Sequence, residues 1–189
     1  MNMRISKDCI DGCVEGDNVS QRELYDQLLP YLNALSGRYL NDTFHRKDVL
    51  QEAFILISNR IDQFDATKGE FHSWASKILI NQCLKNNRRF KGKYYSQIEN
   101  HEEPQPVSPE ILNQLTNEEI VRFLRTMPPK YYEVFNLHII DGYSHEEIGE
   151  LLGIRVSSSR KRLSRARAWL QAKPNSLNTL LGDYRFSIS

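Results

Sequence analysis

A polar stretch between residues 92 and 115 separates the 189-residue chain into two parts. It carries Pro104, Pro106 and Pro109, and its apolar residues follow no regular period. On both sides of it, apolar residues recur at the three- and four-residue intervals of an amphipathic helix. A structureless segment of this length is uncommon inside one compact domain. We therefore predict an all-α fold with two small helical domains joined by a flexible linker. The predicted bounds are 1–91 and 116–173 for the domains, 92–115 for the linker and 174–189 for a C-terminal tail.

Three helices are predicted in the first domain from the spacing of their apolar residues. Pro30 lies inside the first helix and predicts a kink or a break, because proline cannot donate the backbone hydrogen bond. A loop that ends at Gly69 separates the second helix from the third. The predicted helices cover about residues 22–40, 46–61 and 71–89. The side chains expected in the core of the third helix are Phe71, Trp74, Ala75, Ile78 and Leu79.

The second domain is predicted to end in a short helix, a tight turn and a basic helix. The short helix begins at a capping box formed by Ser144 and Glu147, and Gly153 marks its end. The preceding helix is predicted to bury Ile139. Short helix, glycine turn and basic helix (about residues 156–171) form the helix-turn-helix pattern, in which the second helix enters the DNA major groove. The alternative is an ordinary helical hairpin with a basic surface.

Basic residues gather in two clusters, although the formal net charge of the chain is only +1. Acidic residues lie between the clusters. Two such patches can present separate faces to a polyanion, and they can equally be two solvated helix faces. The first cluster consists of Lys85, Arg88, Arg89, Lys91 and Lys93, and the second of Arg155, Arg160, Lys161, Arg162, Arg165, Arg167 and Lys173.

The basic helix offers side chains for reading DNA. Arg160 and Lys161 can reach guanine edges or phosphates. The other arginines point in different directions around the helix, and we expect Arg165 to lie on a phosphate. Small donors that suit a close approach to the DNA backbone are Ser157, Ser158 and Ser159. The contacts predicted from this helix are Arg155, Ser157, Ser158, Arg160, Lys161, Arg162 and Arg165.

The sequence offers little for catalysis. Its histidines have no metal-ligand spacing, and no glycine-rich phosphate loop or nucleophile arrangement occurs. Cys9, Cys13 and Cys83 are odd in number and sparsely spaced, which fits a reducing compartment. Neither a signal peptide nor an apolar run of about 20 residues is present. We expect a cytoplasmic protein that is not an enzyme, uses no metal or cofactor and does not insert into a membrane.

Two blocks of sequence carry a family resemblance. The first-domain block consists of residues 48–54, 69–75, 80–81 and 87–89. The second-domain block consists of residues 127–137, 142–149 and 162–167. In this order, and joined by a proline-containing linker, they resemble regions two and four of the extracytoplasmic-function sigma factors. The resemblance covers most of the chain between Leu24 and Leu170.

The resemblance implies a transcription initiation factor that binds core RNA polymerase, directs it to promoter DNA and assists duplex opening. In this family, region two docks on the clamp helices of the polymerase's largest subunit, and the flap is a further contact. Carboxylates and amides on an exposed helix face suit a basic coiled coil. The implied polymerase contacts are Asp48, Gln51, Glu52, Ile55 and Asn59. An anti-sigma factor or another targeting factor is a further partner that the resemblance implies.

The resemblance also places the minus-ten promoter element against the loop before the third helix and against that helix. Bases that leave the duplex stack need aromatic surfaces and a polar pocket. Phe71 and Trp74 fall on the apolar stripe, which favours core positions over stacking platforms. Leu79 and Ile80 stand where the family usually has a basic residue before Asn81. The implied minus-ten contacts are Lys68, Lys77, Asn81, Lys85, Arg88 and Arg89.

Region four of the family binds the upstream, minus-thirty-five element. Ser158 and Ser159 replace a common threonine-valine pair, and Arg155 stands where a serine commonly caps the helix. The promoter sequence therefore does not follow from the relatives. The rival hypothesis is a stand-alone helix-turn-helix regulator that binds operator DNA without polymerase. Such a regulator would not need the face around Asp48, and it would usually form a dimer.

Overall fold

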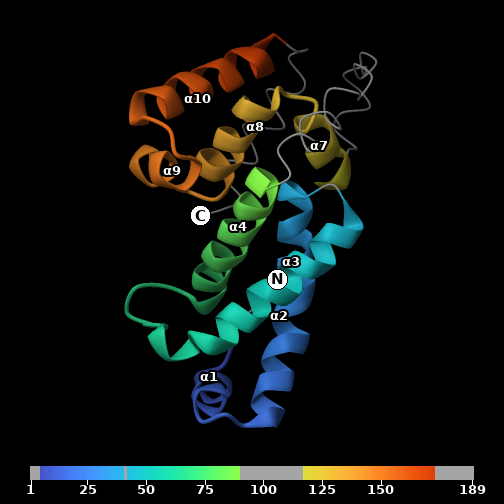
Figure 1. The fold of residues 1–189 in the computed structure, drawn as a ribbon, viewed down its shortest axis with the longest axis vertical. Coiled ribbons are helices and arrows are strands. Elements are labelled where there is room, and N and C mark those ends of the chain that lie inside the picture. The colour runs from blue at the N-terminus through green and yellow to red at the C-terminus, as the bar shows by residue number, and fades with distance from the viewer. Residues whose placement is uncertain (1–4, 41, 90–116, 173–189) are drawn as a thin grey trace. The chain divides into compact units, whose positions relative to one another are not determined.

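The computed structural model describes residues 5–40, 42–89 and 117–172. Regular secondary structure in these residues is helical, with no β-strand, as predicted for an all-α chain. The chain divides into two compact units, Met1–Phe90 and Lys91–Ser189 (Figure 1). The predicted linker over 92–115 and the predicted tail over 174–189 lie outside the described residues.

The first unit is a bundle of helices. The elements are α1 (Lys7–Val14), α2 (Asn18–Tyr39), α3 (Thr43–Asn59), the 3-10 turn η1 (Ile61–Gln63) and α4 (Phe71–Arg89). Helices α2, α3 and α4 pack against one another, and α1 lies beside the start of α2 (Figure 1). Their apolar stripes meet in a core whose fully buried side chains include Leu28, Leu32, Ile57, Leu79, Ile80 and Leu84.

Of the two predicted effects of Pro30, a kink or a break, the break does not occur, because α2 continues through this residue as one helix. Pro30 is exposed, while Leu28 and Leu32 on the opposite side are fully buried. Burial of these leucines offsets the one backbone hydrogen bond that proline removes. The spacing of apolar residues does not predict helix α1, because this helix is short and mostly polar. Its buried side chains are Cys9 and Cys13.

Helix α4 begins and ends where the sequence predicts. Phe71, Ala75 and Leu79 are buried as expected, but Trp74 and Ile78 are only half-buried. The reason is the direction of the buried face, which also includes Ser76, Ile80, Cys83, Leu84 and Asn87. At 3.6 residues per turn, that face is centred away from Trp74. The prediction that Trp74 and Ile78 are core residues is therefore wrong.

The second unit contains α7 (Asn117–Leu124), α8 (Pro129–Phe135), the π-helical turn η2 (Asn136–Ile140), α9 (His145–Leu152) and α10 (Val156–Gln171). Helix α10 packs on α8 and α9 (Figure 1). In the π-helical turn, the N–H of Asp141 donates to the carbonyl of Asn136, five residues earlier, at 2.9 Å. The wider turn shifts the helical register. Leu137 is therefore fully buried and Ile139 only half-buried, contrary to the prediction for Ile139.

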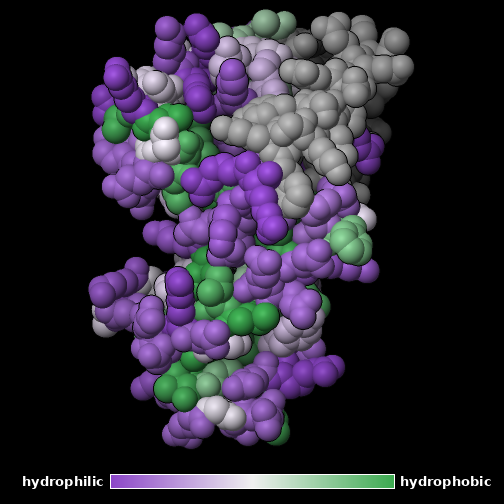
Figure 2. Space-filling view, viewed as in Figure 1, coloured by the Kyte–Doolittle hydropathy of each residue, from purple (hydrophilic) through white to green (hydrophobic). Residues whose placement is uncertain are grey.

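The face of the molecule drawn in Figure 2 is mainly hydrophilic. None of the helices in the described ranges combines the length and hydropathy that crossing a membrane requires. The large hydrophobic side chains exposed in these ranges are Val14, Val19, Tyr25, Tyr31, Phe44 and Ile55.

Candidate functional site

Helices α9 and α10 form the predicted helix-turn-helix. At the start of α9, the Ser144 side chain accepts from the N–H of Glu147, and the Glu147 carboxylate accepts from the N–H of Ser144. This confirms the capping box. The helix ends at Gly153, whose φ of 64° lies in the left-handed region that glycine adopts without steric penalty. A Cβ at Gly149 would lie 3.0 Å from the carbonyl oxygen of Ile154, so the absence of a side chain lets the turn close tightly on α9.

Two polar contacts join α9 to α10. Nδ1 of His145 lies 2.9 Å from Oγ of Ser159, and Nη2 of Arg160 lies 3.5 Å from Oε1 of Glu146. Ser159 is fully buried, so the prediction that its hydroxyl approaches DNA is wrong. Its position in the helix turns it toward the supporting helices together with the other buried residues of α10, Leu163, Ala166 and Leu170.

The remaining predicted contacts of α10 differ in exposure. Ser158 and Arg162 are half-buried. The guanidinium of Arg165 donates to the hydroxyl of Tyr131 on α8 at 3.2 Å and lies 6.0 Å from the centre of its ring. Arg155 occupies the N-cap position without a side-chain capping bond. The exposed members of the set are Arg155, Ser157, Arg160, Lys161 and Arg165.

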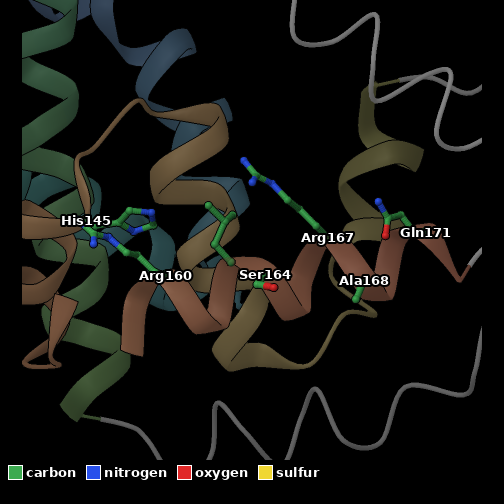
Figure 3. A pocket seen from close by; sticks show the side chains of 7 residues that line it. His145, Arg160, Ser164, Arg167, Ala168 and Gln171 are labelled. Carbon is green, nitrogen blue, oxygen red and sulfur yellow. The ribbon is translucent and has the colours of Figure 1, made fainter. Parts of the chain in front are cut away.

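A cavity of about 490 Å³ lies along α10 beside the first turn of α9 (Figure 3). Figure 3 shows Arg160 beside His145, with Arg167 further along the helix. Burial lowers the pKa of His145, and the nearby His138 and Arg160 lower it further. The His138 ring stacks on it at a centroid distance of 4.4 Å. The cavity is lined by His145, Arg160, Leu163, Ser164, Arg167, Ala168 and Gln171.

Sequence reasoning did not assign Ser164, Arg167 or Gln171 to the DNA-contacting set. The sequence does indicate that they share one side of α10, because Arg160, Ser164, Arg167 and Gln171 follow one another at intervals of four, three and four residues. His145 could not be found in this way, because it comes from another helix.

The exposed face of α3 carries all five predicted polymerase contacts. At 3.6 residues per turn, their side chains leave α3 within an arc of about 100°. The carboxylates of Asp48 and Glu52 make no ion pair or hydrogen bond with another side chain in the described part of the chain. The face therefore presents negative charge that is not neutralised within the described residues. Its members are Asp48, Gln51, Glu52, Ile55 and Asn59.

A smaller cavity, of about 260 Å³, lies where the loop before α4 meets that helix. The rings of Phe64 and Trp74 lie 5.8 Å apart between centroids on its apolar side. On its polar side, Lys68 forms an ion pair with Asp65 at 3.1 Å. Hydrogen bonds from the Thr67 hydroxyl and backbone N–H, with a smaller contribution from Lys68, lower the pKa of Asp65 to about 2. The lining residues are Gln63, Phe64, Asp65, Lys68, Gly69, Glu70, Ser73, Trp74 and Lys77.

The six predicted minus-ten contacts are all exposed. Lys68 and Lys77 line the smaller cavity. The other four lie further along α4, at Asn81, Lys85, Arg88 and Arg89. The structure thus brings the first pair together at a pocket and arranges the rest along one helix.

No group of three histidine, cysteine or acidic side chains within residues 5–40, 42–89 and 117–172 could hold a metal ion. Cys9, Cys13 and Cys83 are buried free thiols. Burial raises the pKa of Cys83 to about 12, so this thiol is a packing residue.

Comparison with known proteins gives the family. The model of Sigma-70 region 2 matches residues 24–92, and that of Sigma-70 region 4 matches residues 117–170. The ECF RNA polymerase sigma factor SigW of Bacillus subtilis (strain 168) is 29% identical over 90% of this chain and 97% of its own length. The ECF RNA polymerase sigma-E factor of Escherichia coli (strain K12) is 27% identical over 67% of this chain and 72% of its own length.

Among solved structures, the sigma factor RpoE in complex with the anti-sigma factor NepR from Bartonella quintana aligns with a TM-score of 0.48 at 20% identity. The alignment covers 85% of this chain and 96% of RpoE. Both sigma-70 regions are present in the family's order, and SigW is matched over nearly its whole length. The chain therefore belongs to the extracytoplasmic-function sigma factors of the sigma-70 family.

Proposed function

We propose that this sigma factor binds the polymerase through the exposed face of α3 and contacts promoter DNA through α4 and α10. Membership of the family makes the protein a transcription initiation factor that directs RNA polymerase to promoters. It works in the cytoplasm, where polymerase works, and its own side chains perform no chemical step. One observation carries the proposal: acidic and basic side chains are exposed on separate helices, Asp48 and Glu52 on α3 and Arg160 and Lys161 on α10.

The α3 face binds the basic coiled coil of the polymerase's largest subunit. Asp48 and Glu52 accept charge-assisted hydrogen bonds from that surface. Because these carboxylates have no side-chain partner in the described residues, docking breaks no internal ion pair. Ile55 lies among them and adds apolar contact area.

Helix α10 reads the upstream promoter element in the major groove. Arg160 and Lys161 are exposed and adjacent, which suits bonds to guanine edges and neighbouring phosphates. Arg165 is held at the side of the helix by Tyr131, and it contacts the DNA backbone. The cavity beside His145 and Arg167 is cationic and accepts a further phosphate.

The smaller cavity receives a base that leaves the duplex during promoter opening. Stacking on an aromatic ring stabilises an unpaired base, and Trp74 is sufficiently exposed at this cavity to provide the ring. Lys77 lies in the same cavity and neutralises the adjacent phosphate.

Transcription in vitro tests the proposal. The full chain, purified core RNA polymerase and a library of genomic promoter fragments are mixed, and the transcript ends are mapped. We expect starts at a discrete set of promoters that require both the chain and the polymerase. Tight binding of the chain alone to these fragments, with no transcripts in the complete mixture, would instead establish a stand-alone regulator.

A further inference from the structure

Two of the large hydrophobic side chains that the described residues expose lie on α3. Phe44 is 69% exposed and Ile55 is 53% exposed. Single exposed apolar side chains are normal on protein surfaces, so exposure alone carries no functional meaning. Their placement does, because at 3.6 residues per turn they differ by only about 20° around the helix and by about 16 Å along it.

Between these two side chains along the helix lie Asp48 and Glu52, which form the acidic centre of the α3 face. Phe44 is offset by only about 40° from Asp48 and about 20° from Gln51 around the helix. Along its exposed side, α3 therefore presents an apolar group, then carboxylates and an amide, then a second apolar group. Phe44 continues the proposed polymerase face by one helical turn toward the N-terminus of α3.

The backbone that carries Phe44 is held in place. Its N–H donates to Oδ1 of Asp42, the N-cap residue of α3, at 2.8 Å. Asp42 also lies 2.8 Å from Nδ1 of His45, whose ring meets the Phe44 ring edge-on at 6.1 Å between centroids. Because this turn is already ordered, covering the ring costs only the conformational freedom of the Phe44 side chain and none of the backbone.

We propose that Phe44 is an apolar anchor of the polymerase interface. The inference rests on the proposed function of α3, and its occupant is the same basic coiled coil of the polymerase's largest subunit. Charge complementarity selects this occupant, because the carboxylates of Asp48 and Glu52, which have no side-chain partner in the described residues, suit a basic surface. Aromatic anchors contribute strongly to binding when they are buried in an interface, and they exclude water from charged neighbours such as Asp48.

A binding titration of the full chain with core polymerase tests the anchor. We expect Phe44→Ala to weaken binding about tenfold and Phe44→Leu to weaken it less. The matched control is Val19→Ala on α2, since Val19 is 73% exposed and lies on another helix, and we expect no change. Alanine favours a helix more than phenylalanine does, so α3 should remain folded. Denaturant unfolding of each variant verifies this.

Salt distinguishes the anchor from the acidic centre. The loss caused by Phe44→Ala should keep its size as the salt concentration rises, because apolar contacts are not screened. The loss caused by the double change Asp48→Lys and Glu52→Lys should shrink. If Phe44→Ala binds like the unmodified protein while the double change loses binding, the anchor is overturned and the proposed function stands.

Two other outcomes also overturn the anchor. If neither Phe44→Ala nor the double change at Asp48 and Glu52 affects polymerase binding, the proposed function of α3 fails as well. If Phe44→Ala separates a self-associated form without changing polymerase affinity, the partner of the ring is a second copy of this chain. Sedimentation of the free protein detects that case.

Discussion

The exposed faces of α3 and α10 hold their charged groups in different ways. On α3, Asp48 and Glu52 have no side-chain partner within the described residues. On α10, Arg160 pairs with Glu146 of α9, and Arg165 donates to Tyr131 of α8. Two cations of α10 therefore already have partners on neighbouring helices, whereas the carboxylates of α3 have none among the described residues.

This difference has an energetic consequence. An exposed ion pair contributes at most about 1 kcal/mol, so Glu146 does not prevent DNA from binding Arg160. In the proposed function, DNA replaces one partner of Arg160 with another, whereas Asp48 and Glu52 have no side-chain partner to exchange within the described residues. We expect changes on α3 to affect binding without affecting stability, and changes near α10 to affect DNA affinity through these internal contacts.

The largest expected effect belongs to the double change Asp48→Lys and Glu52→Lys. Like charges facing each other at an interface are unfavourable by several kcal/mol, so we expect polymerase affinity to fall by about 100-fold or more. The free energy of unfolding should change by no more than about 0.5 kcal/mol, because the carboxylates have no internal partner. A polymerase titration and urea denaturation measure the two quantities.

The matched control for this change is Asp11→Lys with Glu15→Lys, which reverses two exposed carboxylates at the same spacing at the end of α1. Retained polymerase binding in the α3 variant would show that α3 is not the binding face. A large loss of stability would show that Asp48 and Glu52 stabilise the fold. The carboxylates of α3 would then resemble the cations of α10, which have partners within the protein.

The second effect concerns the double change Arg160→Ala and Lys161→Ala. Each good base contact that is removed should weaken binding to the upstream element by about 1–3 kcal/mol. Footprinting of the promoter complex measures the loss, and Lys130→Ala on α8, also exposed, is the control. An unchanged upstream footprint would mean that α10 does not read the DNA.

A smaller effect should follow Glu146→Gln. The change removes the charge that holds Arg160 and keeps the size of the side chain, so DNA affinity should rise by no more than about fivefold. Glu150→Gln, on an exposed position of the same helix, is the control for a general reduction of negative charge. Weaker DNA binding by Glu146→Gln would show that Glu146 orients Arg160 for base contact.

The smallest effect is a pH dependence of stability. The folded-state pKa of His145 lies below its ordinary value of 6.5, chiefly because of burial. As the pH falls below 6.5, the unfolded chain takes up a proton before the folded chain does, so stability falls until the folded pKa is passed. Thermal unfolding between pH 7.5 and 5 should show a larger loss for the unmodified protein than for His145→Gln. Equal losses would exclude this contribution from His145.

Much of the fold follows from local sequence signals. The bounds of α4 and the capping box of α9 agree with prediction because both depend on neighbouring residues. Helix α1 could not be predicted from local signals, because its two cysteines are buried only through contact with other elements of the first unit. The half-buried state of Trp74 depends on where the rest of the bundle places the centre of the core, and spacing within α4 cannot reveal it.

The candidate site shows a similar limit. Helical spacing predicts which side chains share a face of α3, and the five proposed polymerase contacts are all exposed. Helical spacing does not predict the hydrogen bond between Ser159 and His145 or the one from Arg165 to Tyr131, since each joins different helices. The roles of all these residues in binding stay predictions.

The close approach of the Ile154 carbonyl to Gly149 distinguishes a position that must stay small from positions whose side chains can change. A Cβ there would lie 3.0 Å from the Ile154 carbonyl oxygen, so any larger residue requires the turn that leads into α10 to shift by a few tenths of an ångström. Exposed positions such as Arg160 and Lys161 can be exchanged without touching that support. Retargeting this protein to other promoters therefore calls for substitutions at exposed positions of α10, with Gly149 left unchanged.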